Sequence, residues 1–153
     1  MMLGGEFKVS IDDKGRILIP ARMKDSVPEG TLIITRGVER CLWLLIEKTW
    51  KELSERIMGN PWSMFDNQSR LLQRRIIAPA QECLIKSGRV TIPSSLRDAA
   101  DLEIRSEVML LGIQNRLELW NLEEYQRYIE KSDREFLEAS EAIGKDLRHV
   151  RAP

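Results

Sequence analysis

The stretch Ile11-Asp12-Asp13-Lys14-Gly15-Arg16-Ile17-Leu18-Ile19-Pro20 returns later in the chain as Leu84-Ile85-Lys86-Ser87-Gly88-Arg89-Val90-Thr91-Ile92-Pro93. Each copy has a polar turn that closes on a glycine able to adopt a positive φ, then an arginine, then an apolar run ended by proline. This pattern is typical of a hairpin turn that leads into a strand, with a short helix after the proline. The chain therefore contains one structural unit twice. In the first copy, the consecutive apolar residues Ile17-Leu18-Ile19 predict a strand that is covered on both faces.

The repeat extends beyond the two turns. An offset of 73 aligns Gly15 with Gly88, and an offset of 75 then aligns Leu44 with Leu119. The resulting unit of about 45 residues reads as strand, turn, strand, short helix, loop, strand, turn, strand and helix. Two copies are too few for a solenoid, so we expect two units that share one core.

Hydrophobic periodicity divides the chain into four segments. Residues 6–50 and 79–125 are the two repeats, residues 51–78 form a helical connector, and residues 126–153 form a charged tail that we expect to be helical. Short strands dominate both repeats, and the remaining segments are helical. The predicted fold class is therefore α+β, mainly β with flanking helices.

Composition limits the class of protein. The 153 residues are 42% hydrophobic and 31% charged, as in ordinary soluble globular proteins. No apolar run approaches the roughly 18–20 residues of a membrane span, so we expect no membrane partner. Residues 1–5 lack the basic start and the apolar core of a secretory signal, and we therefore expect a cytoplasmic protein.

Residues with catalytic or metal-binding chemistry are few. Cys41 and Cys83 have neither the number needed for a disulfide framework nor the spacing of metal ligands, and the single histidine, His149, lies in the charged tail. The sequence has no Walker-type phosphate loop, no serine elbow and no histidine near a suitable nucleophile. We predict no cofactor, no metal, no small-molecule substrate and no enzymatic activity, with both thiols as buried strand residues.

Charge is balanced overall but unevenly distributed. The chain has 24 basic and 24 acidic residues, and a net charge of zero speaks against purely electrostatic attachment to nucleic acid. Residues 61–97 carry six Lys/Arg against two Asp/Glu, whereas residues 98–130 carry three against eight. Arg70, Arg74 and Arg75 of the connector face either solvent, a neighbouring subunit or DNA, and the sequence leaves this choice open.

The first turn has a physical rationale for binding an anion. Asp12 can accept hydrogen bonds from the N–H groups of the turn or orient Arg16, which leaves the guanidinium at the tip with its donors outward. Such an arginine suits phosphate oxygens or the guanine edge in a major groove, and Lys14 adds a less directional charge. The alternative is a solubilising hairpin with an internal Arg–Asp pair. The recurrence of Gly-Arg in both halves favours the binding interpretation.

Four motifs together resemble the MraZ family: residues 12–20, the turn Thr35-Arg36-Gly37, residues 88–93, and the strand Leu117-Glu118-Leu119-Trp120. The resemblance implies two SpoVT-AbrB (AbrB-like) repeats that form an intrachain, pseudo-symmetric swapped-hairpin β-barrel with flanking helices. It also implies a homo-oligomer in the form of a closed ring. The implied function is that of a nucleoid-associated bacterial transcriptional regulator, which acts on the promoter of the division and cell-wall gene cluster and usually represses its own operon.

The DNA contacts of this family are associated with Asp-x-x-x-Arg turns. The resemblance therefore implies DNA-binding residues in both turns: Asp12, Lys14, Gly15 and Arg16 in the first, and Lys86, Gly88 and Arg89 in the second. The second turn departs from the motif because Ile85 occupies the position of the aspartate. Arg89 is consequently either less rigidly oriented than Arg16 or held by another group.

Affinity for DNA must come from repetition, because one small turn offers few phosphate contacts and the chain has no net positive charge. A ring bound to double-stranded DNA with direct repeats in a promoter engages several turns at once, which raises avidity by about 10²–10⁴-fold. Two other hypotheses stay open. One is an oligomeric protein-interaction scaffold of the same fold without DNA readout, which would use the acidic residues 98–130. The other is a dimeric AbrB-type regulator or antitoxin, against which the internal duplication argues.

Overall fold

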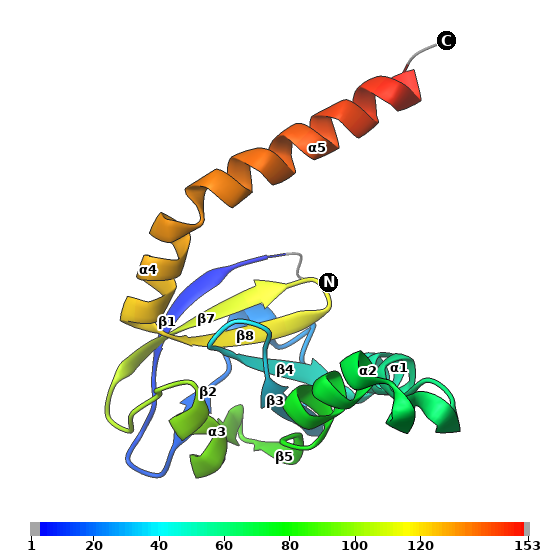
Figure 1. Ribbon diagram of the computed structural model, residues 1–153. Helices are drawn as coiled ribbons and strands as arrows, with labels where there is room; N and C mark the ends of the chain where they lie inside the picture. Colours follow the sequence, from blue (N-terminus) through cyan, green and yellow to red (C-terminus); the bar gives the residue numbers. More distant parts are fainter. Residues whose placement is uncertain (1–3, 152–153) are drawn as a thin grey trace. The chain divides into compact units, whose positions relative to one another are not determined.

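One antiparallel sheet makes up most of the computed structural model, which describes residues 4–151. Within these residues the sheet has eight strands in the order β1-β7-β8-β4-β3-β5-β6-β2 (Figure 1). The strands are β1 (Glu6–Ser10), β2 (Arg16–Leu18), β3 (Thr31–Arg36), β4 (Leu42–Ile46), β5 (Gln81–Lys86), β6 (Arg89–Thr91), β7 (Glu107–Ile113) and β8 (Arg116–Asn121). Residues 1–3, on which the prediction about a secretory signal partly rests, lie outside the described residues.

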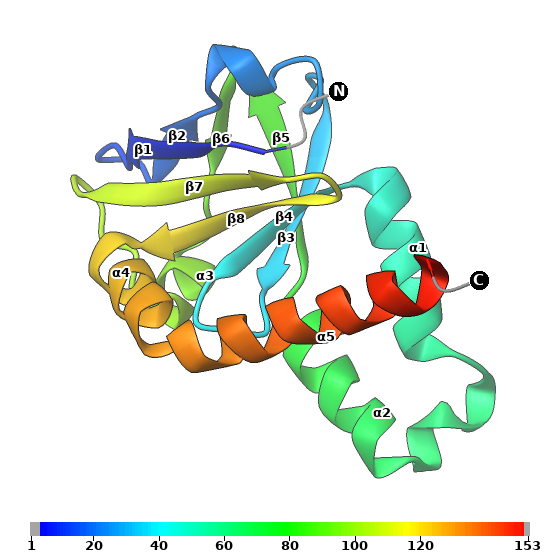
Figure 2. The same ribbon diagram turned by 90° about the horizontal axis from the view of Figure 1, so that it is seen from above.

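The strands of the two repeats interlock. Strand β1 of the first repeat pairs with β7 of the second, and its equivalent β5 pairs with β3 of the first. The β2–β6 and β4–β8 pairs each join equivalent strands of the two repeats. The sheet curls until its end strands, β1 and β2, lie side by side, which gives a nearly closed barrel (Figure 2). The predicted fold class, a mainly β swapped-hairpin barrel of two repeats with flanking helices, is confirmed.

The two equivalent turns connect their strands differently. The second turn closes a true hairpin, in which Lys86 lies opposite Arg89. At the first turn, a hydrogen bond from Asp12 N to Arg16 O (2.9 Å) closes the loop, and β1 and β2 then pair with β7 and β6. Among the described residues, β1 and β2 form no ladder with each other. The hairpin predicted in the first copy is thus a turn between two separated strands, and this place is the open seam of the barrel.

Side chains from both repeats fill the barrel. Strand alternation points Ile17 of β2 and Val90 of β6 inward, and each is 1% exposed. Leu18, in contrast, is 49% exposed, because β2 is an end strand with its outer face in solvent. The prediction that Ile17-Leu18-Ile19 is covered on both faces is therefore wrong at Leu18.

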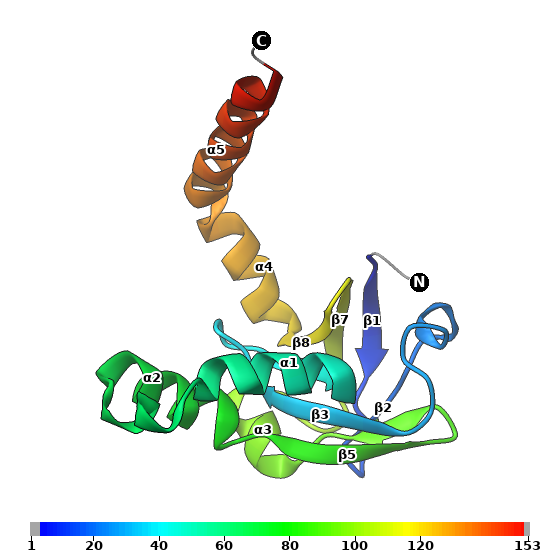
Figure 3. The ribbon, with the colours of Figure 1, turned by 90° about the vertical axis from the view of Figure 1, so that its right-hand side faces the viewer.

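The connector is helical. It contains most of α1 (Glu47–Met58), which begins before residue 51, and all of the 3-10 helix η2 (Pro61–Phe65), α2 (Asn67–Leu72) and the π-helix η3 (Gln73–Ile77). In η3, Ala78 N donates to Gln73 O (2.9 Å), the wide turn that defines a π-helix. The buried hydroxyl of Thr35 donates to Ile76 O (2.6 Å) and fixes this turn to β3. Helix α2 lies on the side of the barrel away from β2 (Figures 1 and 3).

The chain forms two compact units, residues 1–122 (unit 1) and 123–153 (unit 2). In unit 1, the 3-10 helix η1 (Ala21–Met23) and helix α3 (Ser94–Ala99) follow Pro20 and Pro93, as the sequence predicts. Unit 2 contains most of α4 (Leu122–Lys131) and all of α5 (Asp133–Arg151). Strand pairing joins both repeats in one sheet, so the sheet does not divide the chain at the boundaries predicted at residues 50, 78 and 125. These boundaries stay predictions. No helix in the described part of the chain is long and apolar enough to cross a membrane.

Candidate nucleic-acid interface

The first turn is built around the carboxylate of Asp12. Its Oδ1 accepts hydrogen bonds from the backbone N–H groups of Lys14 (2.9 Å) and Arg16 (2.8 Å). Its Oδ2 accepts from Nε of the Arg16 guanidinium at 2.8 Å. Gly15 completes the turn with φ +79°, a conformation that glycine adopts without strain. The turn therefore has an internal framework that sets the direction of the Arg16 side chain.

These hydrogen bonds also keep Asp12 charged. The backbone N–H of Arg16, followed by the Arg16 side chain and the N–H of Lys14, holds the pKa of Asp12 below its usual value of 3.8 against the opposing effect of desolvation. Arg16 uses only Nε for this pair, and no hydrogen bond or ion pair with a described residue engages its Nη1 or Nη2. Its side chain is 38% exposed. Two nitrogens, with four N–H donors, are thus available to a ligand.

The second turn has no carboxylate framework and depends on its backbone conformation. Ser87 (φ +52°) and Gly88 (φ +74°) are its two central residues, and a positive φ at both is the mark of a type I′ hairpin turn. Ile85, at the position of the aspartate, is 4% exposed and belongs to the core. Among the described residues, no side chain forms a hydrogen bond or ion pair with the guanidinium of Arg89. Its placement depends on the hairpin.

The two arginines share one surface, the outward face of the β2–β6 ribbon. In this ribbon Arg16 lies opposite Thr91, Ile17 opposite Val90 and Leu18 opposite Arg89. Ile17 and Val90 point inward, so the residues on either side of them point outward. Arg16 and Arg89 are diagonal neighbours on that face, for which a separation of about 7–8 Å is usual.

Each turn also anchors the strand end of the other repeat. Ile19 N donates to Gly88 O, and Ile92 N donates to Gly15 O, both at 2.8 Å. The two bonds are equivalent under the internal repeat. They fix the two Gly-Arg turns at opposite ends of one short ribbon, so the structure brings the predicted residues of both copies together.

Two further basic residues belong to this surface, and neither is among the residues predicted from the turn motifs. Arg97 of α3 lies against the first turn: a Cβ on Gly15 would be 3.1 Å from Arg97 Nε, which itself donates to Ile92 O (3.0 Å). Lys24, after η1, lies near the second turn, with Cε 4.0 Å from a Cβ on Gly88. The offset of 73 that aligns the turns also aligns Lys24 with Arg97. That alignment was the signal that could have found them.

A groove of about 470 Å³ follows the open seam between β1 and β2. Its lining includes three basic side chains, Lys8, Arg16 and Arg89, and one acidic side chain, Asp12, which is already paired with Arg16. Leu18 also lines it. The excess of positive charge makes this groove suitable for an anionic ligand such as a phosphate backbone.

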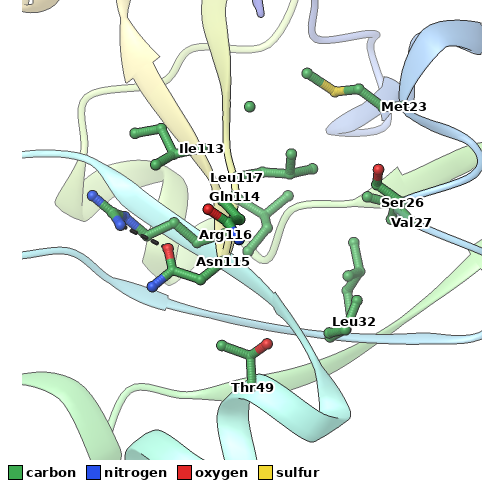
Figure 4. A pocket seen from close by; sticks show the side chains of 13 residues that line it. Met23, Ser26, Val27, Leu32, Thr49, Ile113, Gln114, Asn115, Arg116 and Leu117 are labelled. Atoms are coloured by element: carbon green, nitrogen blue, oxygen red, sulfur yellow. Dashed lines mark hydrogen bonds between the residues drawn. The ribbon is translucent and has the colours of Figure 1, made fainter. Parts of the chain in front are cut away.

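A second, smaller cavity lies elsewhere in unit 1 and contains none of the predicted binding residues. Its volume is about 60 Å³, and its lining includes Met23, Leu32, Asn115 and Arg116 (Figure 4). Arg116 Nη1 donates there to Asn115 Oδ1 at 2.9 Å. Among the described residues, no three His, Cys, Asp or Glu side chains are grouped so as to hold a metal ion.

Both cysteines are buried, as the sequence predicts, but only Cys83 lies in a strand (β5), whereas Cys41 lies in the β3–β4 loop directly before β4. Burial raises the pKa of both thiols, and the negative charges of Glu118 and Glu39 add to the effect at Cys41. A thiol that stays protonated is a poor nucleophile and a poor metal ligand. Both residues therefore act as small apolar side chains of the core.

The arginines of the connector do not join the ribbon surface. Arg70 donates to Met64 O (3.2 Å) and to Asn67 Oδ1 (3.4 Å) within the connector itself. Arg70 belongs to α2, and Arg74 and Arg75 belong to η3, which follows directly. Helix α2 lies away from β2 in all three views of unit 1 (Figures 1–3).

Comparison with known proteins decides the family. The family model described as "MraZ protein, putative antitoxin-like" matches the chain twice, over residues 2–75 and 76–146. The chain belongs to the MraZ family. It is 45% identical over 142 residues to the transcriptional regulator MraZ of Treponema denticola, which covers 92% of this chain and 96% of that protein.

More distant members of the MraZ family agree over nearly the whole chain. The transcriptional regulator MraZ of Treponema pallidum is 35% identical over 140 residues, covering 91% of this chain and 92% of that protein. That of Natranaerobius thermophilus is 34% identical over 143 residues, covering 93% and 96%. These MraZ proteins are named for transcriptional regulation, which is not a class of enzyme.

Proposed function

We propose that this chain is a sequence-specific regulator of transcription that binds double-stranded DNA through the outward face of the β2–β6 ribbon. The observation that carries the proposal is the convergence of Arg16 and Arg89, from two repeats, on one face beside a basic groove. Arginine suits this role because its planar fork bonds phosphate oxygens and the O6/N7 edge of guanine in pairs. Lys14, Lys86, Lys24 and Arg97 surround the two turns and add positive charge.

The same proposal includes the DNA sequence that is bound and the oligomer that binds it. Because one ribbon offers few contacts and the chain has no net charge, binding depends on a closed ring that presents several ribbons to direct repeats in a promoter. We infer that the promoter is that of the division and cell-wall gene cluster and that the protein represses its own operon. The protein then acts in the cytoplasm, on the nucleoid.

A fluorescence-anisotropy titration tests the proposal. The wild-type protein is compared with Arg16→Ala on a duplex from upstream of its own gene and on a scrambled duplex. We expect the wild type to prefer the promoter duplex and Arg16→Ala, still folded, to lose that preference. We also expect log Kobs to fall with log[salt] at about −0.9 per neutralised phosphate.

The matched control removes the same charge from another place. Arg56→Ala changes an arginine of α1 that is outside the ribbon and the groove, and it should keep the promoter preference. If the wild type binds both duplexes equally weakly, with a salt slope near zero, the proposal is wrong.

One observation also fits the alternative, an oligomeric interaction scaffold without DNA readout. The connector exposes a cluster of large apolar side chains: Trp62 is 74% exposed, Phe65 is 72% exposed and Met64 is 60% exposed. The rings of Trp62 and Phe65 stack with centroids 6.2 Å apart. Such a patch is typical of a protein-binding surface. The scaffold hypothesis predicts that Arg16→Ala leaves DNA affinity unchanged.

A further inference from the structure

Two outward side chains of the β2–β6 ribbon have no role in the contacts proposed above. Leu18 lies opposite Arg89, and Thr91 lies opposite Arg16. The offset of 73 aligns Leu18 with Thr91, so they occupy equivalent positions in the two repeats. Together with the two arginines they make up the four outward residues of this three-pair ladder.

Leu18 is unusual for this surface. It is 49% exposed, although it lines a groove with Arg16 and Arg89 and the rest of its strand is polar or buried. Its Cδ1 lies 3.4 Å from the position of a Cβ on Gly88, which places the side chain against the second turn. A basic surface that bound phosphate alone would gain nothing from an apolar side chain at its centre. The position fits a ligand that has apolar groups among its polar atoms.

The major-groove edge of DNA has this mixed chemistry. Guanine presents the O6 and N7 acceptors that arginine bonds, and thymine presents a 5-methyl group that apolar side chains contact. The major groove is wide enough for a two-stranded β-ribbon. Side chains two residues apart on a strand are separated by about 6.4–6.8 Å, close to the rise of two base pairs, which is about 6.8 Å. A strand with arginine at one such position and a methyl-bearing residue at the next therefore matches the spacing of bases.

We propose that Leu18 and Thr91 contact the 5-methyl groups of thymines in the major groove and make this ribbon selective for thymine about two base pairs from a base or phosphate held by the arginine of the same strand, Arg16 or Arg89. This inference rests on the proposed function, because it requires the ribbon to face DNA. It adds a residue-level source of sequence preference that positive charge does not supply, since phosphate contacts carry no sequence information.

The test uses the full chain and a duplex from upstream of its own gene in which every thymine is replaced by deoxyuridine. This change removes the 5-methyl groups and keeps the hydrogen-bonding edges. Affinity of the wild type should fall by about fourfold for each methyl group that Leu18 or Thr91 buries. Leu18→Ala should bind the thymine duplex less tightly. Its ratio of dissociation constants, deoxyuridine duplex over thymine duplex, should be smaller than that of the wild type. The interaction is measured as this change in ratio, as in a double-mutant cycle.

The matched control is Val38→Ala, which shortens an exposed apolar side chain (66%) on the β3–β4 loop, outside the ribbon and the groove. It should keep the full ratio between the thymine and deoxyuridine duplexes. Thr91→Ser, which removes only a methyl group, should reduce the ratio less than Leu18→Ala.

Each other outcome is decisive. Promoter-selective binding with no effect of deoxyuridine, or an undiminished ratio in Leu18→Ala, overturns the inference and leaves the proposed function standing. A change of oligomeric mass in Leu18→Ala without a change of ratio assigns Leu18 to a contact between copies and also overturns it. If the wild type does not discriminate promoter from scrambled DNA, both the proposed function and this inference are wrong.

Discussion

Arg97 lies directly over Gly15, so that a Cβ on this glycine would be 3.1 Å from Arg97 Nε. The two residues come from different repeats: Gly15 closes the first turn, and Arg97 belongs to the helix α3 that follows the second. The first turn is thus completed by the other half of the chain. Lys24 and Gly88 form the equivalent but looser contact.

This relationship predicts that Gly15→Ala is more harmful than Gly88→Ala. The two glycines have similar φ values, +79° and +74°, so the conformational cost to alanine is shared and amounts to about 1–3 kcal/mol. The approach to a side chain is closer at Gly15, where Arg97 Nε would lie 3.1 Å from the new Cβ, than at Gly88, where Leu18 Cδ1 would lie 3.4 Å away. Urea titration should therefore show a lower free energy of unfolding for Gly15→Ala.

The second arm of this experiment uses Arg97→Ala as the background. Removing the guanidinium should bring the cost of Gly15→Ala down to that of Gly88→Ala, because the φ cost remains and the close approach disappears. Equal costs in the wild-type background would show that Arg97 moves aside freely and that the contact has no energetic weight.

The lowered pKa of Asp12 makes stability depend on pH in the acid range. The carboxylate gains hydrogen bonds on folding, so its stabilising contribution is fully present above the unfolded pKa of about 3.8 and is lost as the pH falls through the lower folded pKa. The difference in unfolding free energy between wild type and Asp12→Asn should be constant near neutral pH and shrink below about pH 4. Urea titrations across pH 2–7 measure this, and a carboxyl-carbon NMR titration of Asp12 gives the folded pKa. A folded pKa at or above 3.8 would contradict the hydrogen-bond arrangement.

Asp12→Asn also separates positioning from charge in DNA binding. The substitution removes a negative charge next to Arg16, so simple electrostatics predicts tighter binding. The structure predicts the opposite, because the amide does not hold the Arg16 guanidinium as an ionised carboxylate does. Promoter affinity should therefore fall in anisotropy titrations. Asp13→Asn removes the same charge from the neighbouring position, and it should bind as tightly as the wild type or tighter.

Much of the fold could be predicted from the sequence because the repeat and its periodicity are local features. The Gly-Arg turns, the strands around them, the helix Glu47–Met58 and the helices after Pro20 and Pro93 follow from residue types and spacing. Sequence patterns did not determine strand pairing. The exposure of Leu18 and the separation of β1 from β2 follow from which strands lie at the ends of the sheet.

In the candidate site, too, local contacts could be predicted from the sequence and contacts between the two repeats could not. Asp12 and Arg16 are four residues apart, and their contact could be predicted from turn chemistry. The aspartate missing at Ile85 predicts that Arg89 is either less rigidly oriented than Arg16 or held by another group. The structure has a type I′ turn there and gives Ile85 to the core, and no side chain among the described residues bonds the Arg89 guanidinium. Arg97 and Lys24 were not selected because their partners lie in the other repeat, and one sequence does not show which side of a short helix meets a distant turn.

The exposed side chains of the connector predict a contact between subunits. Trp62 and Phe65 of η2 are each more than two-thirds exposed, and η2 contains no buried residue, so this tip of the connector leaves its apolar side chains uncovered among the described residues. Trp62→Ser with Phe65→Ser should lower the oligomeric mass measured by light scattering and leave the far-ultraviolet circular dichroism unchanged. Promoter affinity should fall with the mass, by up to the roughly 10²–10⁴-fold that multivalent binding contributes. Val38→Ser, at a residue that is 66% exposed on the β3–β4 loop, is the matched control and should keep both. An unchanged mass in the double variant would exclude η2 as the subunit contact. The next candidates for that contact would be the exposed apolar residues of α5, which are Phe136, Leu137, Ile143 and Leu147.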